Sequence, residues 1–135
     1  MEKRGILLIG HGSRLEHNRK FVEDTAELMR IKHPEYQIRT CYLEHTRPGI
    51  PEGLALLEKE DPDIIIAVPL FLSKGVHILK NIPQLLGLDE SARSRAVTLA
   101  SGKVIPLLYA DPVGADPLLA DILFKNAEQA YAEFK

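Results

Sequence analysis

The sequence predicts a single α/β domain, in which an open, four-stranded parallel sheet carries helices on both faces. The first observation is length, because 135 residues suffice for one compact domain, spanning residues 1–135, with a core of its own. The second is a pair of uninterrupted apolar runs, at residues 5–9 and 64–68, which are typical of strands buried on both faces. The third is that helical patterns follow such runs, and alternating strands and helices form parallel sheets.

The first half of the chain predicts two strand–helix units. Residues 5–9 form the first strand, and a helix follows at residues 15–33. This helix ends at Pro34, because the residue before a proline is pushed out of the helical conformation. A second strand at residues 36–44 leads to a second helix at residues 48–60.

The second half of the chain predicts two further strands and less regular connections. Residues 63–68 form a β-branched, continuous strand, and a short helix is expected at residues 78–86. Residues 89–102 are polar and weakly patterned, so we expect a surface excursion that is partly disordered. A fourth strand at residues 103–108 leads to a closing helix at residues 117–134, with one apolar face.

The composition excludes several classes of protein. The single cysteine, Cys41, leaves no disulfide framework and no multi-cysteine metal site. The net charge is -2 and the basic residues are scattered among acids, so the sequence shows no basic patch that would bind nucleic acid. No apolar run approaches the roughly 20 residues that span a bilayer, and residues 1–4 run into the first strand without a signal-peptide core. We therefore expect a cytoplasmic protein that binds neither nucleic acid nor membranes.

Ionisable residues follow three of the predicted strands. His11, between two glycines, follows the first strand, Glu44 and His45 end the second, and His77 closes the loop after the third. Ligands of parallel sheets bind beyond the carboxyl ends of the strands, where the strand order reverses. Imidazole both binds transition metals and moves protons near neutral pH. These three segments therefore predict one ligand site at one edge of the sheet.

Each of these residues also has a structural explanation. His11 is compatible with a hydrogen-bonded turn, or with a phosphate site built from free N–H groups and the following helix, although no phosphate-loop motif is present. His77 is compatible with a helix cap, and Glu44 with a solvated strand end. Together, two histidines and a carboxylate form an incomplete metal shell, whereas a structural zinc site has four protein ligands. An open shell suits a metal that is held briefly and passed on.

Three stretches of the chain carry a resemblance to one family. They are GILLIGHGSRL at residues 5–15, VPLFLSKGVHILKNIPQLLGL at residues 68–88 and YADPVGAD at residues 109–116. In this order, the sequence resembles the short archaeal form of the class II tetrapyrrole chelatases, the sirohydrochlorin cobaltochelatases and nickelochelatases. The first two stretches each contain a histidine that binds metal in that family, here His11 and His77.

The resemblance implies a chelatase-like fold and a lyase that inserts Ni²⁺ or Co²⁺ into sirohydrochlorin, for coenzyme F430 in methanogenesis or for cobalamin. His11 would be a metal ligand and the proton acceptor, and His77 a metal ligand. Glu44 is a candidate second proton acceptor, and Arg47 a candidate for holding a substrate carboxylate. The macrocycle would lie against the loop residues Leu72, Ser73, Lys74, Gly75, Val76 and His77.

The resemblance also implies the partners of the chain. The short form has half the length of its two-domain relatives, so two chains are expected to form a homodimer that completes the cleft. Metal insertion removes two pyrrole protons and oxidises nothing, so a neutral imidazole suffices as a base and no organic cofactor is expected.

Two other functions fit the same residues. A non-catalytic tetrapyrrole or metal carrier would need the same pocket, because binding residues alone do not distinguish binding from turnover. A histidine-dependent phosphatase would use His11 as its nucleophile. Such phosphatases place an arginine directly before the histidine, where this chain has Gly10.

Overall fold

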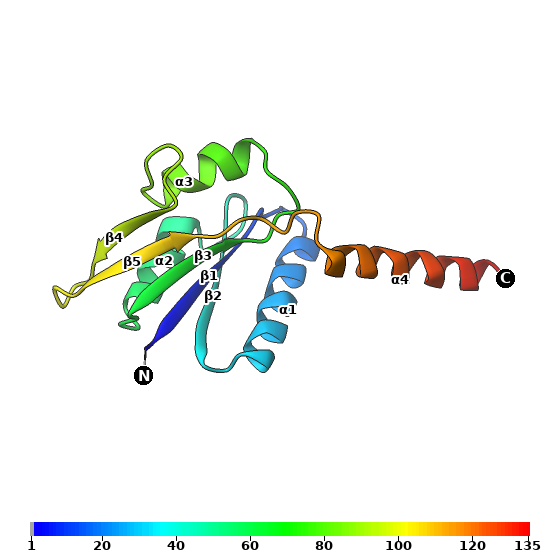
Figure 1. Cartoon of the computed structure of the whole chain (residues 1–135), viewed down its shortest axis with the longest axis horizontal. Helices are drawn as coiled ribbons and strands as arrows, with labels where there is room; N and C mark the ends of the chain where they lie inside the picture. The colour runs from blue at the N-terminus through cyan, green and yellow to red at the C-terminus, as the bar shows by residue number, and fades with distance from the viewer. Residues whose placement is uncertain (1) are drawn as a thin grey trace.

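The computed structural model describes residues 2–135 and shows one sheet with the strand order β2-β1-β3-β5-β4 (Figure 1). Met1 lies outside the described residues. It is the first residue of the predicted domain and of the segment that we expect to lack an export signal. The strands are β1 (Arg4–Gly10), β2 (Tyr36–Tyr42), β3 (Ile64–Pro69), β4 (Ser94–Thr98) and β5 (Val104–Tyr109).

Helices cover both faces of the sheet, as predicted. α1 packs on one face, where Val22 and Ala26 meet Leu8 of β1, and α2 and α3 pack on the other face (Figure 1). None of the helices within residues 2–135 has the length and apolar character that crossing a membrane requires. The helical elements are α1 (Glu16–Lys32), α2 (Ile50–Glu58), a π-helical turn η1 (His77–Asn81), α3 (Ile82–Leu85) and α4 (Pro117–Phe134).

The predicted strand number was wrong, because residues 94–98 form a fifth strand. β4 pairs antiparallel with β5 at one edge of the sheet, so residues 89–102 are not the disordered surface excursion that the sequence predicts. Within β4 only Val97 is buried. A short edge strand that buries one side chain leaves no clear apolar pattern in the sequence, which explains the error.

The strand order reverses beside β1. β2 pairs with one edge of β1 and β3 with its other edge, both in parallel, so Ile9 lies opposite Cys41 on one side and opposite Pro69 on the other. The carboxyl ends of these three strands are therefore level with one another. This is the position at which parallel sheets bind ligands.

α4 contacts the core far less than the sequence predicts. The helix forms, and Asp116 caps it by accepting a hydrogen bond from the N–H of Leu118. None of its residues is buried, however, and it extends away from the sheet (Figure 1). On the α1 face, β5 consequently keeps Val104 and Leu108 exposed.

Candidate functional site

The candidate site lies beyond the ends of β1, β2 and β3. Parallel hydrogen bonding continues past the strands, because the N–H of Glu44 donates to the carbonyl oxygen of His11 at 3.1 Å. On the other edge of β1, the N–H of Leu70 donates to the carbonyl oxygen of Ile9 at 2.8 Å. These bonds fix the segments after the three strands side by side, as the sequence predicts.

Two predicted residues, His11 and Glu44, contact each other directly. Nε2 of His11 lies 3.0 Å from Oε1 of Glu44, and both side chains are about half exposed. An ionised carboxylate only accepts hydrogen bonds, so this contact places the proton of the neutral ring on Nε2 and leaves the Nδ1 lone pair free. Nε2 of His45 lies 4.0 Å from Oε2, the other carboxylate oxygen of Glu44. The backbone of His45 has a φ of 62°.

The glycines beside His11 serve close packing. Gly12 has a φ of 90°, and a Cβ atom there would lie 1.7 Å from the carbonyl oxygen of Glu44. A Cβ atom on Gly10 would lie 2.5 Å from Cγ2 of Val22. A side chain at Gly12 would therefore push apart the segments that bring His11 and Glu44 together, and one at Gly10 would push α1 away from β1.

The N–H groups of the turn after His11 already have partners. The N–H of Gly12 donates to Oδ1 of Asn18 at 2.9 Å, and the N–H of Ser13 donates to Oγ1 of Thr46 at 3.3 Å. A phosphate site of the kind considered above needs such N–H groups to point at the anion. These bonds argue against that alternative.

The third segment brings His77 to His11. The two imidazole rings lie 4.9 Å apart between centroids, and the ring of Phe71 lies 5.8 Å from His11 and 6.3 Å from His77. His77 is half-buried at the start of η1, and its Nδ1 lies 2.8 Å from Oδ1 of Asn81. Three side chains from separate elements thus form a compact group of two imidazoles and one carboxylate.

The loop before His77 presents an apolar, exposed surface. Leu72 is 65% exposed and Val76 is 60% exposed. Ser73 and Gly75 between them are also exposed, and a Cβ atom on Gly75 would meet nothing within 4 Å. Gly75 therefore occupies open space, and the backbone there does not require a glycine.

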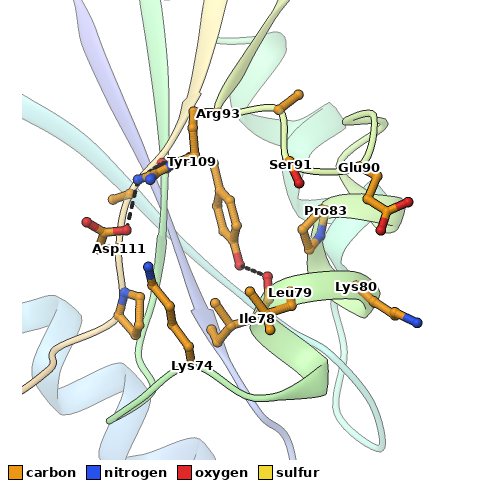
Figure 2. A pocket seen from close by; sticks show the side chains of 13 residues that line it. Lys74, Ile78, Leu79, Lys80, Pro83, Glu90, Ser91, Arg93, Tyr109 and Asp111 are labelled. Atoms are coloured by element: carbon orange, nitrogen blue, oxygen red, sulfur yellow. Dashed lines mark hydrogen bonds and ion pairs between the residues drawn. The ribbon is translucent and has the colours of Figure 1, made fainter.

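Lys74 belongs to the same loop but lines a different cavity. This cavity, of about 310 Å³, lies beside η1, and Tyr109, Arg93 and Asp111 surround it together with Lys74 (Figure 2). The depressions that contain His11 and His77 have other linings. The structure therefore does not bring the ammonium group of Lys74 to the histidine pair.

Arg47 also points away from the two histidines. Its side chain is 91% exposed, and Nη1 lies 3.9 Å from Oε2 of Glu52 on α2. The sequence places it correctly in the segment after β2. In this structure the guanidinium group lies in solvent at the margin of the site.

The site offers imidazole nitrogens and carboxylate oxygens as ligands. Within residues 2–135, no group of three or more histidine, cysteine, aspartate or glutamate side chains is arranged to hold a metal ion. Burial raises the pKa of the Cys41 thiol to about 12, so this side chain stays protonated. The two neighbouring imidazoles are thus the best placed ligands for a transition metal that keeps open coordination positions.

Sequence reasoning missed two residues of the site, Phe71 and Asn81. Phe71 is an aromatic residue in a loop directly after a buried strand, which was a signal for a contact at the sheet edge. Asn81 stands four positions after His77, the spacing at which side chains of one helical turn meet.

Comparisons with known proteins match nearly the whole chain. The family model described as CbiX matches residues 5–130. The chain is 42% identical over 129 residues to a protein of Methanosarcina acetivorans named sirohydrochlorin cobaltochelatase, covering 96% of this chain and 98% of that protein. It is 43% identical over 126 residues to a protein of the same name from Methanococcoides burtonii, covering 93% of this chain and 95% of the relative.

The fold also has a match among solved structures. The sirohydrochlorin chelatase SirB from Bacillus subtilis subspecies spizizenii, in complex with cobalt, superposes with a TM-score of 0.78 at 24% identity. The match covers 94% of this chain but 50% of that one, so this chain spans half the length of SirB. With a family model that matches residues 5–130 and relatives more than 40% identical over nearly their full length, the chain belongs to the CbiX family.

Proposed function

We propose that this protein is a sirohydrochlorin metal chelatase, which inserts Co²⁺ or Ni²⁺ into the macrocycle. The observation that carries the proposal is the pair of imidazoles, His11 and His77, whose ring centroids lie 4.9 Å apart at the point where the strand order reverses. The names of the relatives more than 40% identical support the macrocycle as substrate.

Metal insertion needs a base for two pyrrole protons, and His11 suits that role. With Nε2–H donated to Glu44, the Nδ1 lone pair is the one available to bind an ion or to accept a proton. Once Nδ1 is protonated, the carboxylate of Glu44 stabilises the resulting imidazolium. His77 provides the second imidazole ligand, and Glu44 passes the proton towards solvent.

The macrocycle binds against the loop that ends at His77. Leu72 and Val76 expose apolar side chains that suit the flat ring, and Ser73, Lys74 and Gly75 lie between them. Lys74 and Arg47 bind the peripheral carboxylates after their long side chains swing towards the site, since both are exposed.

The metal is a substrate of this enzyme. Imidazole binds both cobalt and nickel, so the ligand set accepts either ion and the supply in the cell decides between them. Insertion of cobalt serves cobalamin synthesis, and insertion of nickel serves coenzyme F430 synthesis in methanogenesis. The reaction balances with the ion and two released protons, so it uses no organic cofactor.

The active unit is a homodimer. α4 exposes apolar side chains along its length. The segment before α4 is held by two hydrogen bonds, from the N–H groups of Val113 and Gly114 to the carbonyl oxygens of Phe71 and Leu72, at 2.8 and 2.7 Å. These bonds direct the helix away from its own sheet. Val104 and Leu108 leave an apolar strip on the sheet of the same chain. In a homodimer, each α4 covers the apolar strip on the sheet of the partner, so both apolar surfaces become buried.

An anaerobic insertion assay tests the proposal. Purified protein is mixed with sirohydrochlorin and either Co²⁺, Ni²⁺ or an equimolar mixture, and the change from the free to the metallated absorption spectrum is followed. We expect many turnovers per protein and a rate well above spontaneous insertion. A single stoichiometric burst would instead identify a tetrapyrrole or metal carrier and would refute the enzyme.

A further inference from the structure

We propose that Asn81 is the residue that positions His77. Its side-chain oxygen accepts a hydrogen bond from Nδ1–H of His77, at 2.8 Å, and so holds the ring in the tautomer whose Nε2 carries the free lone pair. This inference rests on the proposed role of His77 as a metal ligand. Asn81 is not itself a ligand, but it keeps Nε2 of His77 free to bind the ion.

The backbone between the two residues has an unusual shape that supports their contact. The N–H of Ile82 donates to the carbonyl oxygen of His77, five residues back, which makes η1 a π-helical turn. Regular α-helix would pair that N–H with the carbonyl oxygen of Ile78. Here the oxygen of Ile78 instead accepts the phenol O–H of Tyr109, at 3.0 Å (Figure 2).

Buried residues hold this turn in place. Ile78 and Ile82 belong to the main core cluster, and so does Tyr109, which fixes Ile78 from β5. Pro83 follows Ile82 and has no N–H to extend the ladder, so the turn meets α3 at a defined point. The imidazole of His77 and the amide of Asn81 therefore face each other from a rigid segment.

The amide of Asn81 is suited to this task by its orientation, because its oxygen and not its NH₂ group faces Nδ1 of His77. A half-buried imidazole without a partner on Nδ1 is free to place its proton on either nitrogen, and protonated Nε2 cannot bind a metal ion. Carbonyl oxygen acts only as an acceptor, so its contact selects the Nδ1–H tautomer. Histidines that ligate metals commonly depend on such a partner for their orientation.

The test uses three variants of the full-length protein. Asn81→Leu removes the acceptor at similar size, and Asn81→Asp keeps an acceptor at the same position. Gln84→Leu is the matched control, because Gln84 lines the same depression as His77 and has no hydrogen bond to it. Asn81→Ala repeats the experiment if the leucine variant does not fold, as judged by thermal unfolding.

The first measurement is the tautomer of His77, from ¹⁵N chemical shifts of the imidazole nitrogens without metal. We expect wild type, Asn81→Asp and Gln84→Leu to hold the proton on Nδ1, and Asn81→Leu to shift it towards Nε2. The second is the affinity for Co²⁺ alone, by titration calorimetry. We expect Asn81→Leu to bind about 10–100-fold more weakly, with recovery in Asn81→Asp.

The outcomes separate this inference from the proposed function. If His77 in Asn81→Leu keeps its proton on Nδ1, or if Co²⁺ binds as tightly as in Gln84→Leu, the positioning role is refuted even where wild type inserts metal. If the tautomer shifts and the affinity falls, the role is supported, whether or not sirohydrochlorin proves to be the substrate.

Discussion

The carboxylate of Glu44 lies 3.0 Å from Nε2 of His11, across two neighbouring parallel strands. The contact is built into the backbone, since the N–H of Glu44 donates to the carbonyl oxygen of His11 and Gly12 leaves room for that approach. A carboxylate held in this way orients the ring and fixes which nitrogen carries its proton. Nδ1 of His11 therefore keeps its lone pair free.

Glu44→Gln should slow metal insertion by about 10–100-fold, because the amide keeps the size of the side chain but does not stabilise an imidazolium. The measurement is the initial rate of metallation of sirohydrochlorin with Co²⁺. Glu27→Gln is the control, since Glu27 is an exposed carboxylate on α1 that contacts Arg30 and none of the site residues. Equal rates in the two variants would remove Glu44 from the mechanism.

His11→Ala and His77→Ala should each reduce the insertion rate on the order of 100-fold or more, because each removes an imidazole that binds the ion or accepts a proton. Both residues lie beyond the strand ends and outside the buried core, so thermal unfolding should change little. His33→Ala provides the control, since His33 is an exposed residue after α1. Activity like that of the control would exclude the substituted histidine from the site.

Gly12→Ala and Gly75→Ala should differ in their effect on the free energy of unfolding, because Gly12 is closely packed and Gly75 is not. A Cβ atom on Gly12 collides with the carbonyl oxygen of Glu44 and the φ of 90° is strained for alanine, so we expect a loss of about 2 kcal/mol or more in the free energy of unfolding. Gly75→Ala meets open space and should change this free energy by less than about 0.5 kcal/mol. Urea unfolding measures both. Equal stability of the two variants would contradict the packing argument.

Continuous apolar runs predicted β1 and β3, because burial on both faces leaves an unambiguous pattern in the sequence. They also placed His11 and His77 at the same edge, since residues that follow neighbouring parallel strands must meet there. β4 escaped prediction because an edge strand buries one side chain, Val97, and its pairing with β5 depends on tertiary contact. Edge strands of this kind are defined by their neighbours more than by their own residues.

Side-chain direction was harder to predict than position. Arg47 and Lys74 stand in the expected segments, yet one points into solvent beside Glu52 and the other lines the cavity next to Tyr109. The spacing of Asn81 and His77 was visible in the sequence, but the π-helical shape of the turn between them was not, because the carbonyl oxygen of Ile78 accepts its hydrogen bond from distant Tyr109. A long-range hydrogen bond of this kind has no signature in a local stretch of sequence.

Tyr109→Phe should destabilise the protein by about 1 kcal/mol, because the carbonyl oxygen of Ile78 loses its buried donor. It should also alter the response to alkali. Burial raises the pKa of Tyr109 from 10.0 to about 12. The stability that this group contributes is therefore complete below about pH 10 and is lost between about pH 10 and 12, as the unfolded chain releases its proton first.

The free energy of unfolding, measured at about pH 8 and about pH 11, checks both expectations for Tyr109→Phe. The variant should lose less stability between these two values than wild type does. Some alkaline loss should remain, because burial also raises the pKa of Tyr42 to about 12. A variant with the wild-type pH dependence would show that the phenol of Tyr109 ionises as freely in the folded protein as in the unfolded chain.

Leu123→Glu should convert the proposed homodimer to a monomer. Leu123 is 60% exposed on the apolar face of α4, so a charge there would be buried against the strip of Val104 and Leu108 on the partner. Ala132→Glu adds the same charge about two and a half turns further along, on the opposite side of the helix, and should leave the dimer intact. Light scattering after size-exclusion chromatography gives the mass of each variant. A wild-type monomer, or a dimer that survives Leu123→Glu, would show that α4 does not hold the two copies together.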